Sequence, residues 1–410
     1  MKLILFDDRT ADLWEPFALT RPAGELLFGA LTTRARAEQI FGIRAVAHLA
    51  AGHLAGFEEE GAPPVHGLGD APGDGHRLFL SSRFVPAWEA GVSRFAGGDT
   101  PVALRCSGRV VGWLAPAGSP APPADFLADP DAFADPPAKS VEVAGVLLER
   151  VWELIVENPE QLARDLAVLY PDTTHPPLPR GADRLGEHPL TMGDGVTIEP
   201  GVVFDCSHGP VRLGSGVTVR AFTRLAGPGY VGAGSVILGG SLEAVSIGPL
   251  CKVRGELAES VCLGYVNKAH DGQIGHAYLG RWVNLGAETT NSDLKNSYGT
   301  IRIWTPAGEV DSGQIKLGSL LGDHAKTGIG LLLNTGTVIG AGSNLFGAAM
   351  PPKYVPPFSW GSGSDLGEYR LDKFLQVAGR VMERRGVALS EGMKGQLSRA
   401  WRRGRAEPGG

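Results

Sequence analysis

The chain has 410 residues, which is enough for two or three domains, and 43% of them are apolar, which allows sizeable cores. Its formal net charge of −6 gives no overall sign of nucleic-acid binding. No apolar run is long enough to span a membrane, and the apolar start is too short for a signal peptide. The four cysteines form no CxxC pair, so we expect buried thiols and a reducing, cytoplasmic compartment.

Residues 1–170 are predicted to form one α/β domain of Rossmann-like type. Strand patterns occupy 1–8, 76–84 and 101–116, whereas helical spacing of apolar residues occupies 26–35 and two stretches of 141–170. Strands that alternate with helices are typical of α/β domains, in which ligands gather at strand ends. Asp7 and Asp8 follow the first strand, so they lie where such a ligand is expected.

A proline-rich linker over 171–184 is followed by a repeat of six residues within 185–350. Its clearest stretch of inward positions is Leu321, Thr327, Leu333, Ile339 and Leu345. A period of six fits one short strand and one turn per unit, so that three units close a triangular coil with apolar side chains on its axis. The sequence therefore predicts a parallel β-helix of hexapeptide repeats.

Glycine often follows the inward aliphatic residue, as at Gly214, Gly232, Gly248, Gly264, Gly286 and Gly340. We expect these glycines to supply a positive φ at the corner of each coil. The repeat breaks at 289–313, a polar stretch that is interpreted as a loop leaving one corner, where solenoids often bind ligands. Residues 351–410 are expected to form a proline-rich arm and a helical appendage.

The segment 263–296 is similar to the acetyltransferase half of the bifunctional N-acetylglucosamine-1-phosphate uridylyltransferase/glucosamine-1-phosphate acetyltransferase family. The matching residues are Lys268, His270, Gly280, Asn284, Leu285, Gly286, Ala287 and Asn291. The resemblance implies a left-handed parallel β-helix that forms homotrimers and binds acetyl-CoA or another acyl-CoA between neighbouring helices. It also implies that the acceptor is a sugar phosphate or a nucleotide sugar.

His270 is the predicted catalytic base, because the resemblance aligns it with the family's base and an imidazole can take a proton from an attacking amine near neutral pH. Lys268 and Lys295 could neutralise a sugar phosphate. Asn284 and Asn291 could orient the sugar. Alternatively, the two lysines are solvated loop side chains, and the Asn284 amide forms a ladder with the backbone of the coil. A second histidine, His276, lacks the alignment.

Residues 13–29 resemble the opening of sugar-1-phosphate nucleotidyltransferases, in which a Leu-Thr-Arg-Pro stretch precedes a lysine. The chain departs from that family at three places. Residues 7–14 contain no Gly-rich phosphate loop, Ala23 replaces the lysine, and 81–83 replace the metal-binding aspartate. These losses remove the charge neutralisation that phosphoryl transfer needs. Either this domain binds a nucleotide or a sugar without nucleotidyl transfer from an NTP, or it uses different residues for that reaction.

Arg21 and Arg9 are the predicted substrate-binding residues of this domain, as candidates to hold a phosphate near the strand end. Asp7 and Asp8 could bind Mg²⁺ through their oxygens, and polar capping of the strand is the alternative. The first functional hypothesis is CoA-dependent acyl transfer in sugar-nucleotide metabolism. The alternatives are a non-catalytic sugar-nucleotide sensor or scaffold, and a nucleotidyltransferase alone.

Overall fold

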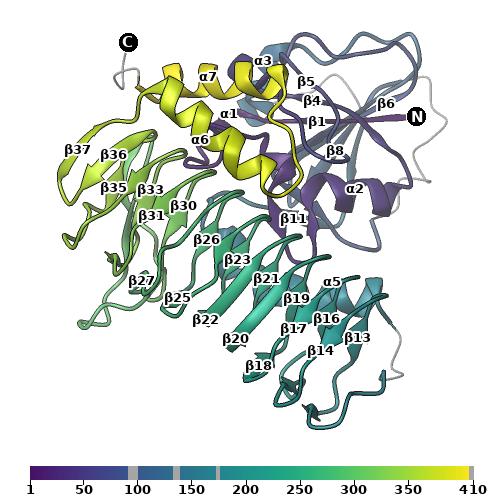
Figure 1. Ribbon diagram of the computed structural model, residues 1–410. Coiled ribbons are helices and arrows are strands. Elements are labelled where there is room, and N and C mark those ends of the chain that lie inside the picture. The colour runs from purple at the N-terminus through teal and green to yellow at the C-terminus, as the bar shows by residue number, and fades with distance from the viewer. Residues whose placement is uncertain (91–99, 133–138, 172–175, 406–410) are drawn as a thin grey trace. The chain divides into compact units, whose positions relative to one another are not determined.

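The computed structural model describes residues 1–90, 100–132, 139–171 and 176–405. Its contacts divide the chain into two compact units. The N-terminal unit comprises 1–26, 31–151 and 390–403, and the solenoid unit comprises 27–30, 152–389 and 404–410. Figure 1 colours the chain from end to end, so the segments of each unit can be traced. The predicted linker lies partly outside the described residues, because 172–175 are not described.

The N-terminal unit is built on a seven-stranded mixed sheet in the order β10-β8-β9-β6-β1-β4-β5. The strands are β1 (Lys2–Phe6), β4 (Ala45–Leu49), β5 (Val65–His66), β6 (Arg77–Ser81), β8 (Val102–Cys106), β9 (Arg109–Ala115) and β10 (Lys139–Glu142). β1 runs parallel to both neighbours, β4 and β6. Its alternate side chains enter two separate cores, with Leu3 and Leu5 in one and Ile4 and Phe6 in the other. The predicted α/β domain is confirmed.

Smaller elements complete this unit. They are α1 (Arg9–Asp12), η1 (Ala23–Glu25), β3 (Leu31–Thr32), α2 (Thr33–Phe41), η2 (Gly52–Leu54), β7 (Phe84–Pro86), α3 (Ala124–Ala128), η4 (Pro130–Ala132), β11 (Gly145–Leu147) and α7 (Glu391–Arg405), whose residues 391–403 belong here. α7 is held by Gln396, which donates to the carbonyl of Thr20 at 3.1 Å. Residues 391–403 of α7 therefore pack within this unit through a buried face that holds Gln396, Leu397 and Ala400.

The helix predicted over 26–35 is wrong up to residue 32. Leu27 and Phe28 form β2 (Leu27–Phe28), and α2 begins only at Thr33. Gly29 has a φ of +69°, and its N–H donates to Asn158 Oδ1 at 2.8 Å. These partners within the solenoid unit satisfy the backbone in an extended form, which overrides the helical spacing of the apolar residues.

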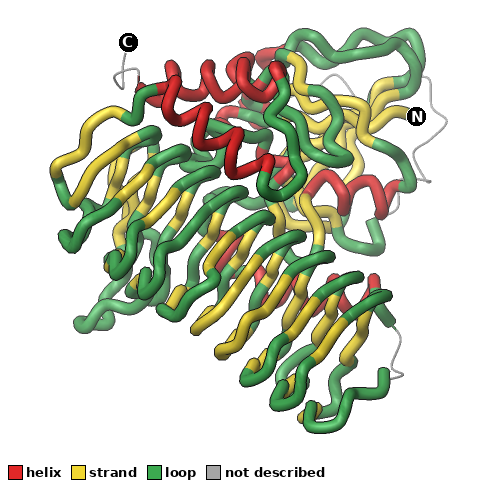
Figure 2. Tube along the Cα trace, viewed as in Figure 1, coloured by secondary structure: helices red, strands yellow, loops and turns green. Residues whose placement is uncertain are grey.

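The solenoid unit coils through three parallel faces, and Figure 2 shows its short strands separated by loops. The first face holds β13 (Leu190–Met192), β16 (Val211–Leu213), β19 (Gly229–Val231), β21 (Ser246–Ile247), β23 (Val261–Cys262), β26 (Tyr278–Leu279), β30 (Leu320–Leu321), β33 (Val338–Ile339) and β35 (Tyr354–Val355). The second holds β14 (Thr197–Ile198), β17 (Thr218–Val219), the starts of β20 (Val236–Glu243) and β22 (Lys252–Ala258), β24 (Asn267–Lys268), β31 (Lys326–Thr327), β34 (Asn344–Leu345) and β36 (Ser359–Ser362).

The third face holds β12 (Asp183–Leu185), β15 (Val203–Asp205), β18 (Thr223–Ala226), the ends of β20 and β22, and β25 (Gln273–Gly275), followed by the pair β27 (Thr290–Asn291) and β32 (Leu332–Leu333). β37 (Asp365–Glu368) pairs antiparallel with β36. The helices of the unit are α4 (Glu153–Val156), α5 (Asn158–Leu169) and α6 (Leu371–Glu383). Coil stacking therefore continues past residue 350, through β35 and β36, before α6 begins.

The register places the repeat's inward residues in columns. Leu213 lies beside Val231, Val231 beside Ile247, and Ile247 beside Cys262. All four side chains are fully buried in one continuous core. The predicted parallel β-helix is confirmed, because each coil buries its apolar side chain against the coils above and below.

The role predicted for the repeat glycines is wrong for most of them. Apart from Gly264, these glycines do not have positive φ. A Cβ on Gly232 would lie 2.6 Å from the carbonyl carbon of Gly248, and one on Gly248 would lie 2.3 Å from the carbonyl oxygen of Leu263. They are therefore needed for the close approach of successive coils. The positive-φ corner comes three residues after the inward aliphatic, at Gly234, Leu250 and Gly342.

The predicted break in the repeat is confirmed as an excursion that leaves the stack after β27 and returns at β30. It contains a hairpin of β28 (Arg302–Thr305) and β29 (Gly308–Asp311). Within the part of the chain that the structure describes, no helix combines the length and apolar character that crossing a bilayer requires. All four cysteines are buried free thiols, as predicted.

Candidate functional site

Three ionisable residues meet at the corner where the third face turns into the first. Glu259, His276 and Asp293 occupy equivalent places on successive passes of the chain, seventeen residues apart. Stacked strands lie about 4.8 Å apart, so equivalent residues are brought within side-chain reach. Glu259 and His276 both have positive φ, of 43° and 45°, which turns the chain sharply at this corner.

The His276 ring is held between two carboxylates. Its Nδ1 lies 2.8 Å from Asp293 Oδ2, and its Nε2 lies 3.2 Å from Glu259 Oε2. The His276 side chain is 8% exposed, whereas that of Glu259 is 40% exposed. Asp293 therefore orients the ring from the buried side, while Nε2 and Glu259 face the more open side.

Asn291 fixes the backbone that carries His276. This asparagine occupies an inward position of the coil, beside Leu333, and is buried. Its Oδ1 accepts from the N–H of Gly275 at 2.8 Å, and its Nδ2 donates to the carbonyl of the same residue at 2.9 Å. The side chain thus replaces a neighbouring strand for the peptide directly before His276, which satisfies both polar groups in the core.

The returning excursion forms one wall of this corner. The Leu317 N–H donates to the carbonyl of Asp293 and the Gly318 N–H to that of His276, both at 2.9 Å. A pocket of about 290 Å³ opens here. It is lined by Val156, Glu259, His276, Gly313, Gln314, Ile315 and Lys316. The polar loop therefore forms one side of an open pocket beside an imidazole and a carboxylate.

The two carboxylates control the charge of the ring. Burial opposes the charged form of His276, but the hydrogen bonds to Asp293 and Glu259 outweigh it and raise the pKa of His276 to about 9. The bond to His276 in turn lowers the pKa of both Glu259 and Asp293. At neutral pH the corner holds an imidazolium between two carboxylates.

This arrangement predicts a pH-dependent stability. A histidine whose pKa is raised on folding stabilises the folded state fully below its unfolded pKa of about 6.5. This stabilisation is lost as the pH rises through the folded pKa of about 9. We expect the free energy of unfolding of His276→Gln to be lower than that of the wild type by on the order of 3 kcal/mol at pH 6 and by much less at pH 10. Urea midpoints at the two pH values measure this. An equal difference at both would contradict the charged ring.

His270 and Lys268 lie on the other side of the coil. His270 is exposed, and its ring makes no hydrogen bond within the described part of the chain. Lys268 is 2% exposed, and its Nζ donates to the carbonyls of Arg254 at 2.7 Å and His270 at 3.1 Å. Burial lowers the pKa of Lys268 to about 8. The lysine thus holds the turn that carries His270.

The other predicted residues of the solenoid are spread over different places. Asn291 joins the His276 corner as described. Asn284 lies on the second face, where its Oδ1 accepts from Asn267 Nδ2 at 2.8 Å. Lys295 is in the excursion, and its Nζ donates to the carbonyl of Thr300. The structure therefore does not bring the predicted set into a single cluster.

In the N-terminal unit the predicted arginines are both paired. Arg21 is buried, and its two terminal nitrogens donate to the carboxylate of Glu59 at 2.8 and 3.1 Å. Arg9 is largely exposed and lies 3.6 Å from Asp129. A phosphate at Arg21 would have to compete with a bidentate carboxylate, which is the stronger partner already in place.

The strand end of β1 does not fit a metal ion. Asp8 caps α1 by accepting from the Ala11 N–H, and its carboxylate also receives Arg83 at 2.7 Å. Burial raises the pKa of Asp7, which favours its neutral form. The described residues contain no group of three histidine, cysteine or acidic side chains arranged to hold a metal. Arg83 thus occupies the place where Mg²⁺ was considered.

Known proteins match this chain over only part of its length. Residues 3–173 match the family described as sugar nucleotidyl transferase. A bifunctional sugar-1-phosphate nucleotidylyltransferase/acetyltransferase from Sulfurisphaera tokodaii is 28% identical over 95 residues, which is 23% of this chain and 24% of that protein. The chain therefore matches about a quarter of that relative's length.

Two solved structures are similar to about half of this chain. An Arabidopsis UDP-N-acetylglucosamine acyltransferase covers 50% of this chain and 78% of its own, at 13% identity and a TM-score of 0.31. AntD, an N-acyltransferase from Bacillus cereus solved with dTDP-4-amino-4,6-dideoxyglucose and coenzyme A, covers 47% and 91%, at 14% identity and a TM-score of 0.23. The strand register of the solenoid establishes the fold independently of these scores.

Proposed function

We propose that the protein is an acyltransferase that moves an acyl group from an acyl-CoA to the amino group of a sugar phosphate or nucleotide sugar. The observation that carries this proposal is the His276 ring held between Asp293 and Glu259 beside a pocket. The sugar nucleotidyl transferase match and the bifunctional relative support a sugar-nucleotide substrate. Two carboxylates favour an amine over a hydroxyl, because an amine arrives as an ammonium ion.

The proposed reaction uses the corner as a base. The ammonium pairs with Glu259 and places a second positive charge beside the imidazolium, which lowers the pKa of His276 and favours release of a proton. The imidazolium and the ammonium each lose one proton to solvent. The neutral amine then attacks the thioester carbonyl, and the neutral His276 Nε2 takes the proton that the attacking nitrogen loses. The C–N bond forms, the C–S bond breaks, and the ring returns the proton to the departing CoA thiolate. Asp293 keeps the ring oriented throughout.

The experiment is an acceptor screen with the full chain. Acetyl-CoA and longer acyl-CoA esters would each be mixed with amino-sugar phosphates and amino-sugar nucleotides, while release of free CoA thiol is followed. We expect CoA release only when an amine acceptor is present, and much faster than with the hydroxyl analogue of the same sugar. Release that is equally fast with both acceptors, or absent with all amines, would overturn the proposal.

A non-catalytic N-terminal unit accompanies this activity in the proposal. Asp8 is neutralised by Arg83 and Arg21 by Glu59, which leaves these residues poorly suited to bind Mg²⁺ and NTP phosphates. The unit would then bind the sugar nucleotide without making it. Mg²⁺-dependent pyrophosphate release from an NTP and a sugar 1-phosphate would instead establish the nucleotidyltransferase alternative. Binding of nucleotide sugars without any CoA turnover would establish the sensor.

We also propose a homotrimer in a cytoplasmic, reducing compartment. The four buried thiols suit a reducing environment. Phe222 and Ile329 are strongly exposed for apolar side chains, at 86% and 78%, which suits burial against another copy. Sedimentation equilibrium tests the assembly, with an expected mass three times that of one chain.

A further inference from the structure

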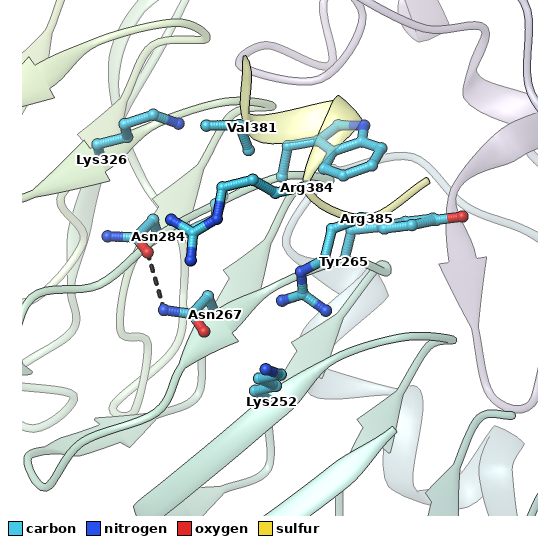
Figure 3. A pocket seen from close by; sticks show the side chains of 10 residues that line it. Lys252, Tyr265, Asn267, Asn284, Lys326, Val381, Arg384 and Arg385 are labelled. Atoms are coloured by element: carbon cyan, nitrogen blue, oxygen red, sulfur yellow. Dashed lines mark hydrogen bonds between the residues drawn. The ribbon is translucent and has the colours of Figure 1, made fainter. Parts of the chain in front are cut away.

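A second pocket lies on the second face of the solenoid unit, away from the His276 corner. Its volume is about 360 Å³, within the range of small-ligand sites. It is lined by Lys252, Tyr265, Asn267, Trp282, Val283, Asn284, Lys326, Val381, Arg384 and Arg385. Figure 3 shows lysine and asparagine side chains from the coils facing arginines from the end of α6. We call this the basic pocket.

The basic pocket is built on a regular column of side chains. Lys252 is in register with Asn267, Asn267 with Asn284, and Asn284 with Lys326. Three strand spacings of about 4.8 Å place the two lysines about 14 Å apart at their Cα atoms. The hydrogen bond from Asn267 Nδ2 to Asn284 Oδ1 fixes the middle of the column. The column therefore carries its two lysines over three strand spacings.

The charges of this pocket are not neutralised by the protein. Within the described chain, none of Lys252, Lys326, Arg384 and Arg385 forms an ion pair, and no acidic residue lines the pocket. Arg385 donates to the carbonyl of Leu250 at 3.0 Å, which fixes its guanidinium near the pocket. Burial lowers the pKa of Lys326 to about 8. Four cations gathered without a counter-charge disfavour the empty pocket and favour an anion within it.

The remaining wall is aromatic and apolar. Tyr265 and Trp282 are stacked with ring centroids 4.0 Å apart, and Val381 of α6 lines the same cavity. Both aromatic residues have positive φ, of 55° and 65°. They occupy the corner where other coils carry glycine, such as Gly234. This wall keeps water from part of the cavity, so that charge interactions inside it are stronger than in open solvent.

We propose that the basic pocket binds the diphosphate group of a nucleotide-type ligand, with Arg384 and Arg385, directly after α6, supplying two of its four cationic groups. The shared chemistry is a diphosphate ester. It could come from a nucleoside diphosphate or nucleotide sugar, or from the diphosphate of coenzyme A. Because the pocket and the His276 corner use different residues, binding here does not depend on the proposed acyl transfer.

Calorimetric titration of the full chain at pH 7 tests this proposal. The probes are inorganic pyrophosphate, UDP, dTDP and coenzyme A, whose relative affinities distinguish the two sources. Lys326→Met and Arg384→Met should each weaken binding of the best probe by about 10- to 100-fold, as expected for one lost charge-assisted hydrogen bond. Lys373→Met is the matched control, because Lys373 is an exposed cation of α6 outside the pocket.

Three outcomes would overturn the proposal. They are no saturable binding of any probe at millimolar concentration, unchanged affinity in both pocket variants, or an equal loss in Lys373→Met. The variants are expected to fold, because neither cation forms an ion pair in the described chain and methionine supplies a flexible apolar side chain in its place. Unchanged melting temperatures without ligand check this. Trp282 lines the pocket, so a change of tryptophan fluorescence that saturates at the same ligand concentration supports binding there.

Discussion

Replacing His276 by glutamine should lower kcat for acyl transfer by about 10²- to 10⁴-fold, the usual contribution of a positioned general base. Glutamine can donate through its amide nitrogen to one of the two carboxylates, but it cannot take a proton from the attacking amine. The effect should fall on kcat more than on KM, because the proton moves only as the bond forms. The measurement is steady-state release of free CoA thiol with the best amine acceptor.

His270→Ala is the matched control for this variant. Among the described residues, the exposed His270 ring makes no hydrogen bond that would orient it as a base. We expect this variant to keep nearly the full rate. If His270→Ala loses the activity while His276→Gln keeps it, the base predicted from the sequence resemblance is correct and the corner is structural.

Leu257→Ala should destabilise the solenoid unit by about 2–5 kcal/mol, as expected when a large side chain is removed from a packed core. Leu257 is fully buried and lies between Leu242 and Ile274 on adjacent coils. A cavity at this level removes contacts with both neighbours at once. The shift in urea midpoint, followed by circular dichroism, measures the loss.

Leu332→Ala is the control within the same solenoid unit. Leu332 is 52% exposed and points outward from the third face, so its truncation should cost less than about 0.5 kcal/mol. Equal losses in the two variants would mean that the alternation of inward and outward side chains does not determine stability here.

The solenoid could be predicted from the sequence because its signal is local and repeated. Each coil needs one apolar side chain on its axis, so Leu213, Val231 and Ile247 recur where the fold requires them. The glycine after each of these residues could also be located in the sequence, but its structural role could not be predicted. A glycine can be required either because its φ is positive or because the next coil leaves no room for a Cβ. Which of the two applies depends on where the next coil lies.

The helix predicted across Leu27 failed for a related reason. Apolar spacing reports which residues are buried and says nothing of hydrogen-bond partners far along the chain. The N–H of Leu27 donates to Tyr278 Oη at 2.8 Å, and that of Ala30 to Asp165 Oδ2 at 2.9 Å. Such partners, more than a hundred residues away, allow an extended backbone to be buried.

The His276 corner was missed because its members look unrelated in the linear sequence. The available signal was the equal spacing of Glu259, His276 and Asp293 by seventeen residues, which matches one full coil of the stack at this point. Asn291 was found as a candidate, although its structural position is inward and its amide supports the backbone of Gly275. A search at the coil period, in addition to the hexapeptide period, would have joined these residues.

The dependence of kcat/KM on pH tests most directly whether His276 acts as the base. For the wild type it should rise with pH and level off near the pKa of about 9 that the two carboxylates impose on the free ring. In His276→Gln that rise should be absent. A wild-type profile that is flat from pH 6 to about pH 9, or one that His276→Gln reproduces, would contradict a catalytic role for this ring.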